Sequence, residues 1–180
     1  MEKHDALITL AEIIIPVSVA LEEIDDWSYK AAASGAHSLL GDIQSSTFLV
    51  TLSLLAEVMA SSLVLSRALQ KVQLDRVTAT AYADRLRSKL IDMRGKAEEE
   101  FAKIYMRAAE LARKLGVSLE KPRTSGRQRF RANMDAYTAE DYFERAVYIP
   151  FLDNFILQLQ VRNQRNLLER ALSCSTSVFC

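Results

Sequence analysis

The residues best suited to chemistry in this sequence are cations gathered in one short stretch. Residues 121–131 hold five Lys and Arg side chains and no Asp or Glu, although the whole chain is neutral. Two polar side chains, Gln128 and Asn133, stand beside them. Ammonium and guanidinium groups on a long connection are suited to the phosphates of DNA. The predicted DNA-binding residues are Lys121, Arg123, Arg127, Gln128, Arg129, Arg131 and Asn133.

The same cations have a structural alternative. Arginines of this kind also pair with acidic helix surfaces and stabilise the C-terminal ends of helices. Charge alone does not decide between DNA contacts and internal ion pairs.

Catalytic and metal-binding patterns are missing from the sequence. It contains no G-x-x-x-x-G-K-[ST], G-x-G-x-x-G, H-E-x-x-H or G-x-S-x-G motif. His37 has no second ligand at a suitable spacing, and Cys174 and Cys180 match no zinc pattern. The run at 98–100 is typical of a solvated helix face. We therefore expect no enzyme, no metal, no cofactor and no small-molecule substrate.

Composition favours a helical globular protein. Apolar residues make up 49% and charged residues 26% of 180 residues, and only 5 Gly and 3 Pro provide turns. We expect one domain over residues 1–172 and a frayed tail over 173–180. The N-terminus shows no signal peptide, and the two cysteines suggest a reduced, intracellular protein.

Apolar residues recur every three or four positions along most of the chain, which predicts α-helices. The expected helices cover 4–26, 28–40, 45–70, 75–115 and 138–172. The expected N-terminal caps of the last three are Ser45 or Ser46, Asp75 and Thr138. The last helix has its expected core face at Tyr142, Val147, Phe151, Phe155 and Leu159. The helix over 75–115 carries expected ion pairs four residues apart, Lys96 with Glu100, Glu99 with Lys103 and Glu110 with Lys114. Pro16 and Pro150 should kink or restart their helices, and Gly41 and Gly116 should lie near helix ends. The clearest stripe runs from Leu86 to Leu115, where Gly95 marks a bend. We expect an all-α bundle of about five long helices, with a basic loop near 117–137.

Three features of the sequence allow alternatives. Residues 48–65 are almost long enough to span a membrane, but Glu57 lies at their centre, so a buried core helix and no membrane partner are expected. The 86–115 stripe is expected to pack within the chain, although it would also suit a coiled-coil seam. Trp27 is expected at the edge of the core; a ligand-stacking role is the alternative.

A series of short motifs near the basic stretch resembles the hAT (hobo–Activator–Tam3) superfamily of transposases. The series consists of Pro122-Arg123, Arg127-Gln128, Arg131-Ala132-Asn133, Tyr142 and Ile149-Pro150-Phe151-Leu152-Asp153. Further agreement lies at 3–6, 21–24, 48–50, 65–70 and 98–101. The resemblance covers about residues 2–172. It is nearest to transposon-derived proteins such as the repressor of the inhibitor of the protein kinase and the zinc finger MYM-type proteins.

The resemblance implies a part of a transposase without its catalytic residues. In that family an RNase H-like core carries an Asp-Asp-Glu triad and is interrupted by a large helical insertion. This chain is similar to the insertion alone, so the aspartates would lie upstream of Met1 and the glutamate beyond Cys180. Such insertions help to hold transposon-end DNA, which implies DNA as partner and the nucleus as location.

Three functional hypotheses follow. The first is a non-catalytic, transposase-derived helical domain that retains DNA binding through 121–131. The second is a helical module for protein–protein interaction or self-association. The third is a decayed transposon fragment without selected activity.

Overall fold

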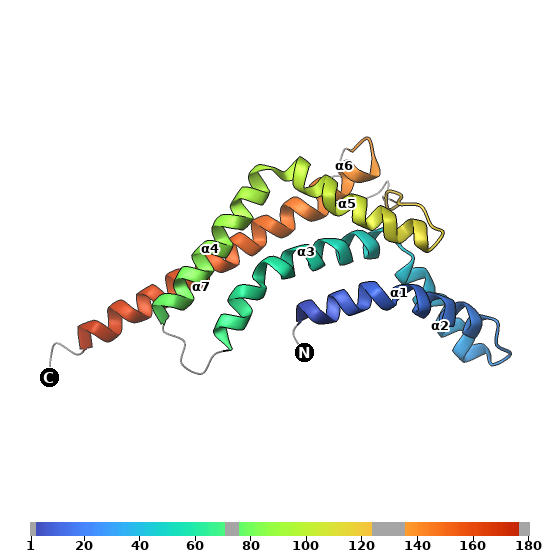
Figure 1. Cartoon of the computed structure of the whole chain (residues 1–180), viewed down its shortest axis with the longest axis horizontal. Helices are drawn as coiled ribbons and strands as arrows, with labels where there is room; N and C mark the ends of the chain where they lie inside the picture. Colours follow the sequence, from blue (N-terminus) through green and yellow to red (C-terminus); the bar gives the residue numbers. More distant parts are fainter. Residues whose placement is uncertain (1–2, 71–75, 124–135, 177–180) are drawn as a thin grey trace, which may run out of the picture. The chain divides into compact units, whose positions relative to one another are not determined.

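The computed structural model describes residues 3–70, 76–123 and 136–176, and every regular element among them is helical (Figure 1). This confirms the all-α class. The helices are α1 (Lys3–Asp25), α2 (Lys30–Ile43), α3 (Ser46–Leu69), α4 (Arg76–Gly95), α5 (Ala97–Lys114), α6 (Ala139–Phe143) and α7 (Ile149–Thr176). A π-helical turn, η1 (Glu144–Tyr148), joins α6 to α7.

The chain divides into two compact units. The first comprises residues 1–60 and 98–148, and the second comprises 61–97 and 149–180. The expected single domain over 1–172 stays a prediction. The helix α7 continues through Ser173 to Thr176, and the expected frayed tail over 173–180 likewise stays a prediction. Polar side chains such as Ser and Thr have only a modest helix penalty, so they can extend a helix by a turn. Residues 177–180 lie outside the described part.

The first unit has its core between α1, α3 and α5. Ile14, Leu49, Leu52 and Ala112 form a buried cluster, against which partly buried residues of the same helices pack. The neighbouring stretch of α5 buries Phe101, whose ring centroid lies 5.2 Å from that of Tyr148. These contacts confirm the expected core face of α5.

The apolar helix α3 supplies more buried residues than any other helix in the described chain. Leu49, Val50 and Val58 are completely buried. By length and composition alone, α3 is also the one described helix that could cross a membrane.

Helix ends in the first unit follow the expected capping chemistry. The N–H of Phe48 donates to Ser45 Oγ at 3.2 Å, which caps α3. Gly116 follows α5 with a φ of +70°, and the Val117 N–H returns to the Ala112 carbonyl at 2.9 Å. Together with the Gly116 N–H bond to the Arg113 carbonyl, this forms a Schellman motif.

The structure differs from the predicted helices at Pro16 and after Gly95. Pro16 lies inside α1, which continues without a restart, because the residue is on an exposed face where water can satisfy the lost backbone partner. The long helix expected over 75–115 is instead divided at Lys96 into α4 and α5, directly after Gly95. Glycine is a poor helix former, so it favours a break there. Asp75, its expected N-cap, lies outside the described residues.

The second unit packs α4 against α7 (Figure 1). Leu86, Leu90 and Met93 of α4 are buried, as is Leu152 of α7. Arg94 Nε donates to Asp153 Oδ1 at 2.8 Å. This bond joins the C-terminal end of α4 to the first turns of α7.

The entry into α7 contains a change of helical register. Thr138 caps α6 as expected, since its Oγ1 accepts from the Asp141 N–H at 3.0 Å. The expected core face through Tyr142 and Val147 is wrong, because both are only partly buried while Phe143 and Tyr148 are buried. The buried residues Phe143, Tyr148 and Leu152 are spaced by five and four positions, and the wider turn of η1 accommodates the step of five.

Pro150 explains why the register changes there. Proline has no N–H to donate to the Ala146 carbonyl, so a regular α-helical bond cannot form at that point. The structure places η1 directly before the first turn of α7, where Pro150 is the second residue. The expected restart at this proline is confirmed.

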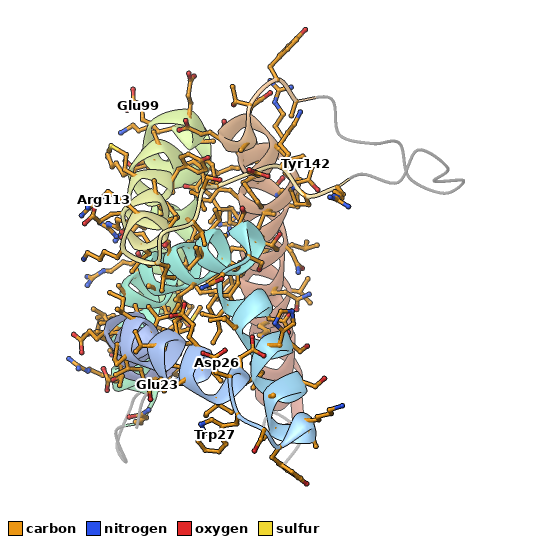
Figure 2. The ribbon with its side chains drawn as sticks, turned by 90° about the vertical axis from the view of Figure 1, so that its right-hand side faces the viewer. Glu23, Asp26, Trp27, Glu99, Arg113 and Tyr142 are labelled. Atoms are coloured by element: carbon orange, nitrogen blue, oxygen red, sulfur yellow. The ribbon has the colours of Figure 1, made fainter. Side chains whose placement is uncertain are left out.

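The expected packing of Trp27 against the core is wrong. Its side chain is 58% exposed in the turn between α1 and α2, and Figure 2 shows it directed away from the helices. The turn leaves no apolar surface beside the indole ring, because Ser28, Tyr29 and Lys30 next to it are exposed as well.

Candidate functional site

Two of the seven predicted DNA-binding residues lie in the described chain. Lys121 and Arg123 are exposed and follow α5 on a segment without regular structure. Arg127, Gln128, Arg129, Arg131 and Asn133 lie outside the described residues. The structure therefore describes the chain up to Arg123 and again from Ala136.

Lys121 contacts the segment that precedes α6. Lys121 Nζ donates a hydrogen bond of 2.6 Å to the backbone carbonyl of Ala136, and Ala136 is buried. The adjoining Glu120 N–H donates to Ser46 Oγ at 2.8 Å, which holds the segment of Lys121 against the start of α3. Residues 121 and 136, which stand on either side of residues 124–135, thus lie side by side in the first unit. Periodicity could not have revealed this contact, because neither residue lies in a periodic element.

Most cations of α5 already have carboxylates beside them. Arg113 Nη2 lies 2.8 Å from Glu110 Oε1, and Lys114 Nζ lies 3.7 Å from the same oxygen. The hydrogen bond from Arg113 lowers the pKa of the Glu110 carboxyl below its usual value. The expected pair of Glu110 with Lys114 is confirmed, and Arg113 joins it.

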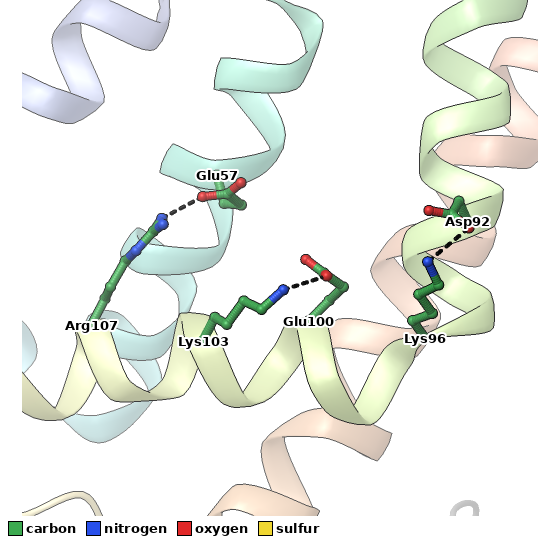
Figure 3. Close-up of polar contacts among 6 residues, drawn as sticks. All are labelled: Glu57, Asp92, Lys96, Glu100, Lys103 and Arg107. Atoms are coloured by element: carbon green, nitrogen blue, oxygen red, sulfur yellow. Dashed lines mark hydrogen bonds and ion pairs between the residues drawn. The ribbon is translucent and has the colours of Figure 1, made fainter.

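The expected pairs of Lys96 with Glu100 and of Glu99 with Lys103 are not the ones observed, because both lysines have other partners. Figure 3 shows Lys103 bonded to Glu100, at 2.6 Å, and Lys96 with Asp92, at 3.6 Å. The hydrogen bond to Glu100 raises the pKa of the Lys103 ammonium. The break at Lys96 separates that residue from the regular turns of α5, which explains why it pairs backwards along the chain.

Asp153, at the end of the Ile149–Asp153 motif, is a candidate ion-pair partner for one of the basic-stretch arginines. In the structure it pairs with Arg94 of α4, within the second unit. Its pairing with an arginine of the basic stretch stays a prediction, because Arg127, Arg129 and Arg131 lie outside the described residues.

An open apolar groove in the first unit was not foreseen. It has a volume of about 550 Å³ and lies between α1, α3 and α5. Ala11, Leu52, Ala56 and Leu111 contribute to its apolar lining, and Met106 at its side is 65% exposed. The sequence signal was Met106, an apolar residue outside the buried stripe of α5.

Charged groups border this groove. Lys103, Arg107 and Glu110 contribute to its lining. Figure 3 shows that Arg107 donates to Glu57 of α3, which places an ion pair beside the apolar surface. The groove thus combines an apolar floor with charged edges, an arrangement that suits an amphipathic partner.

Among the described residues, no group of three or more His, Cys, Asp and Glu side chains is placed to hold a metal ion. His37 lies 3.0 Å from Asp25 through its Nδ1, which ties α2 to the end of α1.

Comparisons with known proteins returned no relative. A scan against protein-family models found no matching family, and searches of curated proteins and of solved structures found no match. The resemblance to hAT transposases consequently rests on the sequence motifs alone.

Proposed function

We propose that this chain is a non-catalytic helical domain, derived from an hAT transposase, that binds DNA through the cations of residues 121–131. The observation that carries the proposal is the density of charge, with five cations and no acid in eleven residues. A DNA backbone presents phosphates at regular intervals, so several cations on one segment can each neutralise a charge. The nucleus is the corresponding location.

The geometry at the base of this segment supports the proposal. The bond from Lys121 to Ala136 joins the first residue of this segment to a residue beyond its end, and both residues belong to the first unit. The described cations of α5, by contrast, lie beside Glu100 and Glu110 on their own helix. The basic stretch is therefore the better candidate for an external anion.

Salt dependence of DNA binding is the direct test. A fluorescein-labelled duplex is titrated with the full chain between low and physiological salt. If all five cations contact phosphates, the logarithm of affinity should fall with the logarithm of salt with a slope of about −4.5. The variant R127A/R129A/R131A retains two of these cations, so its slope should be about −1.8.

A matched control removes the same charge elsewhere. The variant K103Q/R113Q/K114Q loses three cations that lie beside carboxylates on α5. It should reduce DNA affinity much less than the triple alanine variant. The proposal fails if the wild type does not bind at low salt or if the two variants lose affinity equally.

The groove favours a second candidate function, which is self-association of the helical domain. An apolar groove beside an exposed Met106 is suited to cover by another helix. Sedimentation equilibrium should then show dimers that M106E abolishes, while M106L retains them. A monomer at high concentration would exclude this function.

A further inference from the structure

The C-terminal end of α1 carries an unusual concentration of negative charge. Residues 22–29, here called the acidic turn, contain four acids and no Lys or Arg. The C-terminal end of a helix already has a partial negative charge, so carboxylates there are unfavourable. The last turn of α1 contains no basic residue to offset them.

One of the four acids has a partner in α2, and Lys30 directly follows the acidic turn. His37 of α2 lies 3.0 Å from Asp25 Oδ2. Glu22, Glu23 and Asp26 are exposed. The end of α1 is therefore a place where a further positive charge would be bound favourably.

Two aromatic side chains lie exposed beside these acids. Trp27 is 58% and Tyr29 is 69% exposed. Figure 2 shows Glu23, Asp26 and Trp27 at the same end of the first unit. Both rings are therefore open to solvent and accessible to a partner.

The backbone fixes where these aromatic residues lie. The Trp27 N–H donates to the Ile24 carbonyl at 3.1 Å, which closes the turn after α1. The Tyr29 carbonyl accepts from the N–H groups of Ala32 and Ala33 at the start of α2. Trp27 thus follows the end of α1, and Tyr29 directly precedes α2.

Carboxylates beside aromatic rings are suited to bind cationic side chains. An Arg guanidinium or a Lys ammonium is attracted by the face of Trp or Tyr and pairs with Asp and Glu. Arginine also stacks its planar group on aromatic rings. Phosphates are repelled by the same carboxylates, which separates this surface from the DNA site proposed above.

We propose that the acidic turn binds an Arg- and Lys-rich segment of a partner protein. The cations of the segment pair with Glu23 and Asp26 and lie over the rings of Trp27 and Tyr29. This surface is distinct in charge and in sequence from residues 121–131. It gives the domain a second, protein-directed contact.

A labelled basic peptide tests the proposal. The probe is a fluorescein-labelled peptide with four arginines alternating with glycine, and its anisotropy is measured with the full chain at low salt. The variant W27A/Y29A should weaken binding about tenfold, because it removes both cation–π contacts. The variant E23Q/D26N should weaken it by a similar factor, whereas W27F should retain most of the affinity.

A charge-matched control separates recognition from general attraction. The variant E98Q/E99Q removes two exposed acids from α5 and should change the affinity less than twofold. Circular dichroism verifies that each variant retains its helices. The DNA affinity of W27A/Y29A should equal that of the wild type.

Three results would overturn the proposal. The first is an absence of peptide binding by the wild type at low salt. The second is an equal loss in E98Q/E99Q and E23Q/D26N, or no loss in W27A/Y29A. The third is self-association of the wild type that W27A/Y29A abolishes, since a second copy would then occupy the turn.

Discussion

Arg107 of α5 donates a hydrogen bond to Glu57 at the middle of α3. Glu57 is the acidic residue of a mainly apolar helix, and its side chain is 30% exposed. The pair connects two helices whose apolar faces form the core of the first unit. It therefore places a charge of α3 next to a partner of opposite sign.

A double-mutant cycle should measure a modest coupling for this pair. Partly exposed ion pairs contribute about 0.2–1 kcal/mol, since solvent screens the charges. Urea unfolding of E57Q, R107Q and the double variant gives the coupling free energy. It should decrease in 1 M salt. A coupling several times larger would show that the pair is desolvated in solution.

The register change at η1 predicts unequal effects of two adjacent aromatic residues. Phe143 is 1% exposed, so F143A should lower the free energy of unfolding by about 3–5 kcal/mol. Tyr142 is only partly buried, and Y142A should have a clearly smaller effect. Urea unfolding followed by circular dichroism provides the comparison. A larger loss in Y142A would mean that Tyr142, and not Phe143, is the buried residue in solution.

Two glycine-to-alanine substitutions should change stability in opposite directions. Gly116 has a φ of +70°, where a Cβ is unfavourable, so G116A should destabilise by about 1–2 kcal/mol. Gly35 lies within α2 with no atom near the added Cβ, so G35A should stabilise by about 0.5–1 kcal/mol. Thermal unfolding of both variants checks the signs. A stabilising G116A would be incompatible with the Schellman motif.

Glu144 predicts a pH dependence of stability. Burial raises the pKa of its carboxyl above the usual 4.5, and the nearby Glu98 and Asp141 raise it further. The folded state thus binds this proton more tightly than the unfolded state does. Its stabilising effect is present below pH 4.5 and is lost as pH rises through the raised pKa.

The variant E144Q isolates this effect. A neutral amide carries no charge at any pH, so E144Q should be more stable than the wild type at pH 7. The difference should shrink toward pH 4. In an E98Q background the gain should be smaller, since Glu98 is one of the causes. Thermal midpoints at both pH values test this, and a pH-independent difference would contradict it.

The helices could be predicted from sequence because their signals are local. The caps at Ser45 and Thr138 and the buried stripe of Phe101, Ile104 and Ala108 depend on residues within one or two turns. The division at Lys96 could not be predicted from the stripe. Met93, Ala97 and Phe101 retain a spacing of four across it.

The register at η1 and the candidate sites required the folded structure. Tyr142 and Phe143 are adjacent aromatic residues, so apolar character alone could not show that Phe143 is the buried one. The contact of Lys121 with Ala136 joins two non-periodic segments. The groove beside Met106 needs three helices that are distant in sequence. Such features depend on tertiary packing, which local patterns do not specify.

The exposure of Trp27 determines how this protein can be followed by optical spectroscopy. It is the single tryptophan in the chain, so intrinsic fluorescence excited at long wavelength reports one place only. Because that place is largely hydrated in the folded state, unfolding should shift the emission maximum little. The fluorescence of Trp27 should therefore respond to a ligand bound at the α1–α2 turn and change little when the core unfolds.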